Sequence, residues 1–184
     1  MTVVYLLRHG EADYGHYERR GWPGATADLA PLSPRGEREA LAAADALSEV
    51  GATAVVSSPM TRALQTAGIV AAYLGLPLEV EFDLHEWLPD ETFSWRTYAE
   101  VQAASADFEA CGFEWPPGER RTWEPLSQVR ARATAAMESA TAGLADDDVL
   151  IAACHGFVIW SLTGIRGTDT GQWHRIEFDG IGVA

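Results

Sequence analysis

Short apolar runs alternate with helical segments along the chain, and this alternation constrains the fold more than any other feature. Three runs have the apolar character of strands buried on both faces, at 2–7, 53–57 and 149–153, and a further short strand is predicted at 77–82. A fifth, at 173–178, alternates like a more exposed strand. Helical patterns occupy 33–50, 58–74, 95–110, 125–143 and 157–163. This order predicts an α/β fold, a three-layer α/β/α sandwich with a mostly parallel central sheet.

Two of the helices have a clear start signal, in which a serine precedes a proline. Ser33-Pro34 and Ser58-Pro59 each place a capping hydroxyl before a residue that suits the first helical turn. Gly51 follows the first of these helices and Gly75 follows the second, as expected for helix ends. We therefore predict helices that begin at these two serines.

The segment 84–123 breaks the alternation. It holds four of the seven tryptophans and three prolines, and it is rich in Asp and Glu. We expect a single domain over 1–184, in which this segment is an insertion that folds over the ligand-binding edge of the sheet and forms a small aromatic core of its own.

The charge balance excludes several classes of protein. The chain has 13 basic and 27 acidic residues, a formal net charge of −14, which repels phosphate backbones and anionic membranes. No apolar run reaches the roughly 18 residues of a membrane-spanning helix, and the N-terminus is too short for a signal peptide. We expect a cytoplasmic protein that binds neither nucleic acid nor a membrane, with Cys111 and Cys154 as free thiols. The absence of lysine excludes Schiff-base chemistry and lysine-dependent phosphate loops.

Unusual side chains follow three of the predicted strands. Arg8 and His9 follow the first strand, Arg62 lies in the first turn after the second, and His155 follows the fourth. The carboxyl ends of parallel strands meet at one edge of a sheet, so we expect these four side chains to converge there. Gly10 follows His9, and a glycine there lets the backbone approach a ligand closely.

Two imidazoles and two guanidinium groups in an acidic chain predict a pocket for a dianion. Guanidinium groups bind phosphoryl oxygens through two parallel hydrogen bonds. One histidine can attack phosphorus, and the other can donate to an oxygen as charge develops on it. No spacing of the five histidines is typical of metal ligands, so we expect no metal and no cofactor.

The chain resembles the histidine phosphatase superfamily, the phosphoglycerate-mutase-like group. The resemblance rests on LLRHGE at 6–11, which contains the RHG motif, and on LSPRGEREA at 32–40, SSPMTRALQTA at 57–67 and CHG at 154–156. It covers residues 3 to about 163, with the motifs in the family's order and spacing.

The resemblance implies a role for each matching residue. His9 becomes the nucleophile that is phosphorylated, and Arg8, Arg62 and His155 bind the phosphoryl oxygens, with Gly10 at the same phosphate site. The family's proton donor lies in a leucine–x–glutamate segment, which LHE at 84–86 matches, so Glu86 is the expected acid. Three nearby carboxyl groups are alternatives for that role: Asp83, Asp90 and Glu91.

The chain departs from the mutases of the family at two places. Ala12 and Gly15 stand where mutase-like members have a hydroxyl residue and an asparagine that hold substrate, and 29 residues follow His155, fewer than a covering tail needs. We therefore predict a metal-free phosphatase that hydrolyses a small phosphorylated substrate through a phosphohistidine. A phosphoglycerate-type phosphomutase and a non-catalytic phospho-ligand binding module are the alternatives.

Several points stay open from the sequence. The substrate's identity and the oligomeric state are among them, with a homodimer as one possibility. The arginine pairs at 19–20 and 120–121 are interpreted as solvated, with contact to a substrate tail as the alternative. Trp87 and Trp22 are candidates for the pocket mouth. Cys154 is interpreted as a small buried residue, with an oxidation that blocks the pocket as the alternative.

Overall fold

The computed structural model describes residues 1–22, 24–145 and 147–179. Its strands are β1 (Thr2–Arg8), β2 (Ala54–Ser57), β3 (Leu78–Val80), β4 (Val149–Cys154) and β5 (Trp173–Phe178). Its α-helices are α1 (Gly15–Glu18), α2 (Pro34–Ala46), α3 (Thr61–Leu74), α4 (Tyr98–Ala110), α5 (Leu126–Thr141) and α6 (Gly156–Thr163). Two 3₁₀ helices, η1 (Gly24–Leu29) and η2 (Phe82–Leu84), complete the set. None of the helices in this part of the chain is both long and apolar enough to cross a membrane.

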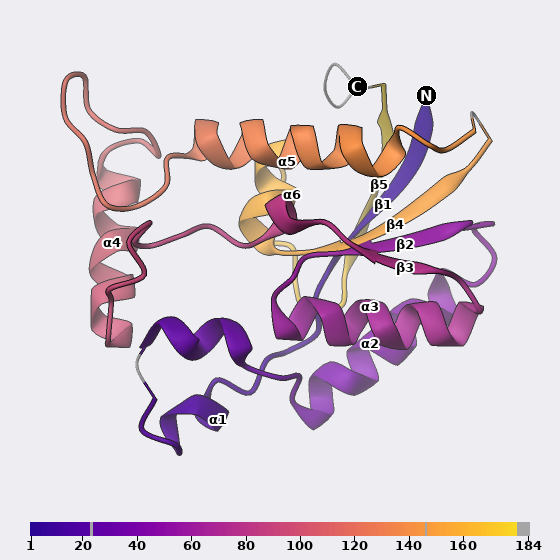
Figure 1. Cartoon of the computed structure of the whole chain (residues 1–184), viewed down its shortest axis with the longest axis horizontal. Helices are drawn as coiled ribbons and strands as arrows, with labels where there is room; N and C mark the ends of the chain where they lie inside the picture. The colour runs from indigo at the N-terminus through magenta and orange to yellow at the C-terminus, as the bar shows by residue number, and fades with distance from the viewer. Residues whose placement is uncertain (23, 146, 180–184) are drawn as a thin grey trace.

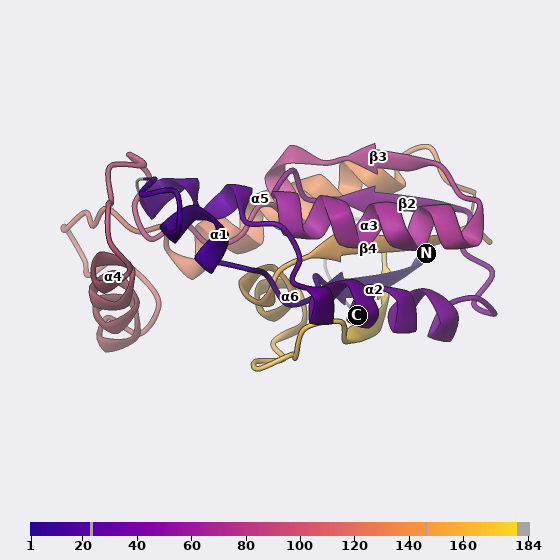
Figure 2. The same cartoon turned by 90° about the horizontal axis from the view of Figure 1, so that it is seen from below.

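The strands form one sheet in the order β3-β2-β4-β1-β5. β1, β2, β3 and β4 run parallel to one another, and β5 runs antiparallel to β1 at the edge. Helices cover both faces of the sheet, α2 and α3 on one side and α5 and α6 on the other (Figures 1 and 2). The predicted α/β sandwich with a mostly parallel sheet is confirmed.

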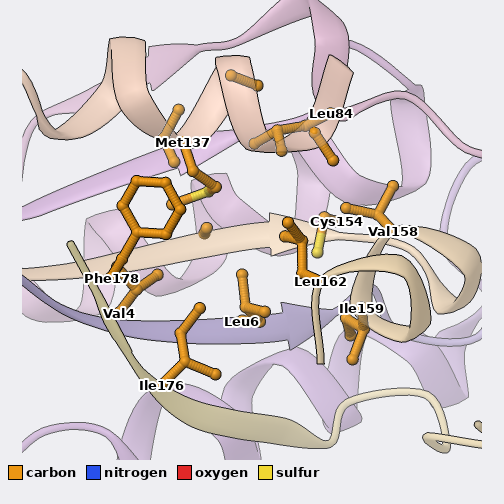
Figure 3. Close-up of a cluster of buried hydrophobic side chains, with 14 of the residues drawn as sticks. Val4, Leu6, Leu84, Met137, Cys154, Val158, Ile159, Leu162, Ile176 and Phe178 are labelled. Atoms are coloured by element: carbon orange, nitrogen blue, oxygen red, sulfur yellow. The ribbon is translucent and has the colours of Figure 1, made fainter. Parts of the chain in front are cut away.

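Alternate side chains of β1, β2, β4 and β5 enter two separate cores, whereas β3 is shorter than the strand predicted over 77–82 and is half-buried to exposed. Leu6 packs with α5 and α6, while its neighbour Leu7 packs with α2 and α3. Figure 3 shows the first core, in which Leu6 and Phe178 from the sheet lie near Met137 of α5 and Ile159 of α6. Because both faces are buried, these strands are continuous apolar runs, which is why the sequence reveals them.

The predicted helix boundaries are correct at some positions and wrong at others. Ser33 caps α2 as expected, since its hydroxyl accepts the Gly36 N–H at 3.0 Å. The helix predicted to begin at Ser58 begins at Thr61 instead, with Met60 at the N-cap position. Ser58 does not cap because its hydroxyl is hydrogen-bonded in the site below. Gly75, with φ 69°, ends α3 as predicted, whereas α2 ends at Ala46 with Leu47 at the C-cap, before the predicted end at Gly51.

The segment 84–123 forms a third core, which is aromatic. Trp87, Phe108 and Trp123 are buried there, together with Val129 of α5. Each buried indole N–H has an acceptor: Trp87 donates to the Glu124 carbonyl and Trp123 to the Asp107 carboxylate, both at 2.7 Å. Figures 1 and 2 both show α4 at the end of the molecule, away from the sheet.

The candidate site lies at the carboxyl ends of strands β1 and β4. They are adjacent, yet the chain leaves β1 toward the α2 face and leaves β4 toward α6 on the opposite face. A crevice outside the carboxyl ends of two such strands is where open α/β sheets bind ligands.

Candidate active site

The ends of β1 and β4 bring His9 and His155 together. Arg8 is the register partner of Cys154, so the histidine after each strand lies beside the other. Their ring centroids are 5.0 Å apart, and both rings are buried. The convergence expected from two distant sequence motifs is therefore present in the fold.

His9 is held as a neutral imidazole with one nitrogen facing Arg62. Its Nδ1 lies 2.7 Å from the carbonyl oxygen of Gly10, which can only accept, so Nδ1 carries the proton. Its Nε2 accepts the Arg62 Nε–H at 3.1 Å. Burial, then the positive charges of Arg62 and Arg8, lower the pKa of His9 to about 3. The Nε2 lone pair is thus available at neutral pH.

Arg62 donates to this nitrogen, and Arg8 lies close enough for its charge to lower the pKa of His9. Arg62 is buried in the first turn of α3, with Nη2 lying 3.1 Å from the sulfur of Met60. Arg8 donates from Nη1 to the carbonyl oxygen of Thr168. Both side chains are oriented by the fold before any ligand arrives, which reduces the entropy lost on binding.

His155 is oriented by Ser58. Its Nε2 lies 2.7 Å from the Ser58 hydroxyl, which also accepts the Met60 N–H at 3.3 Å. The serine proton is then free to point at Nε2, leaving the proton of neutral His155 on Nδ1. Burial, then the charge of Arg62, lowers the pKa of His155 well below its usual range, so this ring too is neutral.

Three buried nitrogens near these groups lack a hydrogen-bond partner among the described residues. They are Nε of Arg8, Nη1 of Arg62 and Nδ1 of His155. An unsatisfied buried polar group costs roughly 1–3 kcal/mol, and more when it is charged. A cluster of such donors is suited to bind an anion with several acceptor oxygens.

Glu86 lies between two cavities at this site. One of its carboxyl oxygens accepts the backbone N–H groups of Trp87 at 2.9 Å and Phe157 at 3.2 Å. Burial raises the pKa of Glu86, although these hydrogen bonds and the two arginines of the site act against it. A carboxyl group with a raised pKa is suited to donate a proton.

The other carboxyl groups considered as acids are engaged elsewhere. Burial alone would raise the pKa of Asp90, but hydrogen bonds from Thr92 and Ser94 outweigh it and lower the pKa to about 2. Glu91 accepts the Gln128 amide at 2.7 Å and lies 3.5 Å from Arg120. Asp83 is exposed. Of these carboxyl groups, only Glu86 borders the cavities beside Arg8 and Arg62.

Arg132 of α5 holds the segment that carries Glu86. It donates to the carbonyl oxygens of Asp83 and His85, both at 2.7 Å, and of Glu86 at 3.2 Å. The same guanidinium binds both carboxylate oxygens of Glu124, at 2.6 and 2.9 Å. Arg132 and Glu124 had no predicted role, and Ser58 was expected only to cap a helix, because their partners in the site lie far away in the chain.

The larger cavity beside the site, of about 730 Å³, has aromatic walls. We call it the aromatic cavity; its rings are those of Tyr14, Trp87, Trp95, Tyr98 and Phe157. It opens onto Arg62 and Glu86. A cavity of this size accommodates a small organic molecule.

Gly10 has a packing role that the sequence did not reveal. A Cβ at Gly10 would collide with the carbonyl oxygen of Gly36, and one at Gly36 with that of Glu11. The Gly10 N–H donates to the Thr66 hydroxyl at 3.1 Å, and its carbonyl holds His9. Its part in phosphate binding stays a prediction.

The remaining candidates have other partners or surroundings. Arg19 pairs with Asp13 at 2.8 Å, and Trp22 is exposed. Arg121 lines a separate cavity within the 84–123 segment. Cys154 is fully buried, and burial raises the pKa of its thiol. Across the described residues, no three His, Cys, Asp or Glu side chains are grouped as metal ligands would be.

Comparison with known proteins agrees with this architecture. A model of the histidine phosphatase superfamily (branch 1) matches residues 4–184, and the chain belongs to this family, as its motifs predicted. PhoE of Bacillus subtilis (strain 168), named as an uncharacterized phosphatase, is 32% identical over 170 residues, 92% of this chain and 80% of the relative.

Solved structures show the same fold. YhfR of Bacillus stearothermophilus superposes with a TM-score of 0.76 at 23% identity, over 100% of this chain and 95% of that one. A mycobacterial glucosyl-3-phosphoglycerate phosphatase superposes with a TM-score of 0.75 at 22% identity, with the same coverage.

Proposed function

We propose that the protein is a phosphatase that hydrolyses phosphomonoesters through a phosphohistidine on His9, without a metal ion. One observation carries this proposal. The neutral His9 ring presents its Nε2 lone pair beside the buried, unpartnered nitrogens of Arg8, Arg62 and His155. A nucleophile surrounded by donors is what attack on a phosphoryl dianion requires.

The reaction takes place in two displacements. In the first, Nε2 of His9 attacks phosphorus, the bond from phosphorus to the ester oxygen breaks, and Glu86 gives its proton to the departing alkoxide. In the second, water gives a proton to Glu86 and attacks phosphorus, and the phosphorus–nitrogen bond breaks to release phosphate. Arg8, Arg62 and the Nδ1–H of His155 stabilise the charge on the phosphoryl oxygens in both steps.

The substrate is a small phosphorylated molecule, and the protein acts in the cytoplasm without nucleic acid or membrane partners. The net charge of −14 supports this, since it opposes binding to polyanions. The aromatic cavity supports a partly apolar or neutral body. PhoE, named as a phosphatase, matches 92% of this chain, whereas relatives named as probable phosphoglycerate mutases match 47%, which supports hydrolysis over transfer to a second substrate.

Release of p-nitrophenol from p-nitrophenyl phosphate, measured in EDTA, tests the proposal. The wild-type protein turns over, His9→Ala abolishes turnover, and His155→Ala slows it by about 100-fold, the usual cost of one transition-state donor. His16→Ala, which removes a histidine outside the site, is the control. Turnover that survives His9→Ala, or that requires an added divalent metal, contradicts the proposal.

A further inference from the structure

The aromatic cavity has an uneven distribution of charge. Among the described residues that line it, Arg62 is the one basic side chain, against the carboxyl groups of Asp28, Glu86 and Glu109. Arg62 belongs to the phosphate-binding group, and Glu86 is the acid of the proposed reaction. Apart from Arg62, no basic side chain among the described lining residues can pair with a second anionic group, and Asp28 repels such a group. Glu109 is already paired with Arg166 at 3.2 Å.

Asp28, in η1, is a carboxylate beside the phosphate-binding Arg62. Its Oδ1 lies 3.9 Å from Nη1 of Arg62, beyond hydrogen-bond distance, and the side chain is 35% exposed. No hydrogen bond within the described residues engages this carboxylate, and Nη1 of Arg62 is also unpartnered. A phosphoryl oxygen bound at Nη1 therefore lies next to Asp28, as do the first atoms of the alcohol attached to it.

Burial raises the pKa of Asp28, while the charges of Arg62 and His85 act against this, and in its ionised form the carboxylate can only accept hydrogen bonds. A hydroxyl or ammonium group close to the ester oxygen satisfies it, whereas a carboxylate or second phosphate there meets a like charge in a partly desolvated wall. Such a pairing of attraction and repulsion is how binding sites discriminate between similar ligands.

We propose that Asp28 is a specificity-determining residue that selects phosphomonoesters of hydroxylated or amino alcohols and rejects those with a second anionic group near the ester. The rings of the aromatic cavity contact the rest of the alcohol. This inference rests on the phosphatase activity proposed above and adds the substrate class to it.

Three phosphomonoesters with three-carbon skeletons test this proposal. Glycerol 3-phosphate carries hydroxyls, 3-phosphoglycerate replaces the terminal alcohol by a carboxylate, and n-propyl phosphate lacks both groups. We expect kcat/KM of the wild-type protein for glycerol 3-phosphate to exceed that for each of the others by roughly tenfold or more. Asp28→Asn reduces the preference over 3-phosphoglycerate at least about fivefold, and Asp28→Ser provides a second variant with the charge removed.

Glu49→Gln is the matched control, since it removes one surface carboxylate just before β2, at the amino-terminal end of the sheet, and leaves both ratios unchanged. The proposal is overturned if the wild-type protein prefers 3-phosphoglycerate, or if neither Asp28 variant changes the ratios more than twofold. Failure of the phosphatase function itself looks different, because p-nitrophenyl phosphate is then not hydrolysed either.

Discussion

Glu124→Gln is the substitution with the largest expected effect outside the reacting groups. The Glu124 side chain is 1% exposed and that of Arg132 is 11% exposed, so the pair lies almost entirely within the protein. Glutamine keeps the shape of the side chain but removes its charge, and it turns an amide NH₂ toward a guanidinium that also donates. Arg132 is left with its three carbonyl acceptors and no counter-charge.

The expected cost follows from this geometry. Breaking a buried ion pair by removing one partner costs about 3–5 kcal/mol, because the other charge stays buried. The remaining carbonyl acceptors of Arg132 place this case at the lower end, about 3 kcal/mol. For a chain of this length that loss lowers Tm by roughly 6–12 °C.

Urea unfolding of the variant measures the loss directly, and Arg175→Met is the control. Arg175 pairs with Glu177 at 3.0 Å, but their side chains are 48% and 45% exposed, so breaking that pair costs less than about 1 kcal/mol. The double variant Glu124→Leu with Arg132→Met should recover part of the stability, since no buried charge remains, while the three carbonyl oxygens that Arg132 binds lose their donor. A loss from Glu124→Gln no larger than that from Arg175→Met would refute the assignment of a buried structural pair.

Three further outcomes are expected. Glu86→Gln lowers kcat by about 100-fold on an alkyl phosphate but by less than about fivefold on p-nitrophenyl phosphate, because the leaving group of the latter hardly needs a proton. An equal loss of kcat on both substrates would assign the acid to another group, such as Asp83 or Asp90. Ser58→Ala lowers kcat by about tenfold with little change in KM, because His155 loses the hydrogen bond that fixes its tautomer; a change in KM alone would contradict this. The unfolding free energy falls by about 2 kcal/mol more between pH 7 and pH 5 in the wild type than in His9→Gln. The stability falls because the pKa of His9 is 6.5 in the unfolded chain and about 3 in the folded protein, so below pH 6.5 the unfolded state takes up a proton that the folded state does not. Equal pH dependence of the unfolding free energy in the two proteins would contradict this prediction.

The parts of the fold that were predictable are those with a local physical signature. Buried parallel strands are continuous apolar runs, and β5, exposed on one side, alternates, so the limits of these strands follow from hydrophobic periodicity. Ser33 caps α2 because its hydroxyl can accept the Gly36 N–H while it donates to the Glu11 carboxylate at 2.7 Å. The same signal at Ser58 gave the wrong helix start, since that hydroxyl bonds His155, 97 residues along the chain.

The residues of the site were also predictable only in part. His9, Arg62 and His155 could be brought together in advance because strand ends converge in any parallel sheet. Arg132 contacts residues 46 to 49 positions earlier, and Asp28 lies in a 3₁₀ helix without an apolar pattern. Neither position leaves a periodic signal in the sequence, so only the folded structure reveals them.

The most direct test of the phosphatase account is the covalent intermediate on His9. The protein is mixed with a ³²P-labelled phosphomonoester and quenched in alkali within one turnover, because phosphohistidine survives base and is lost in acid. We expect alkali-stable label in the wild type, no label in His9→Ala, and decay of the wild-type label in water at the rate of turnover. Label that persists until a second substrate arrives would indicate a mutase, and tight phosphate binding without any label would contradict catalysis by His9.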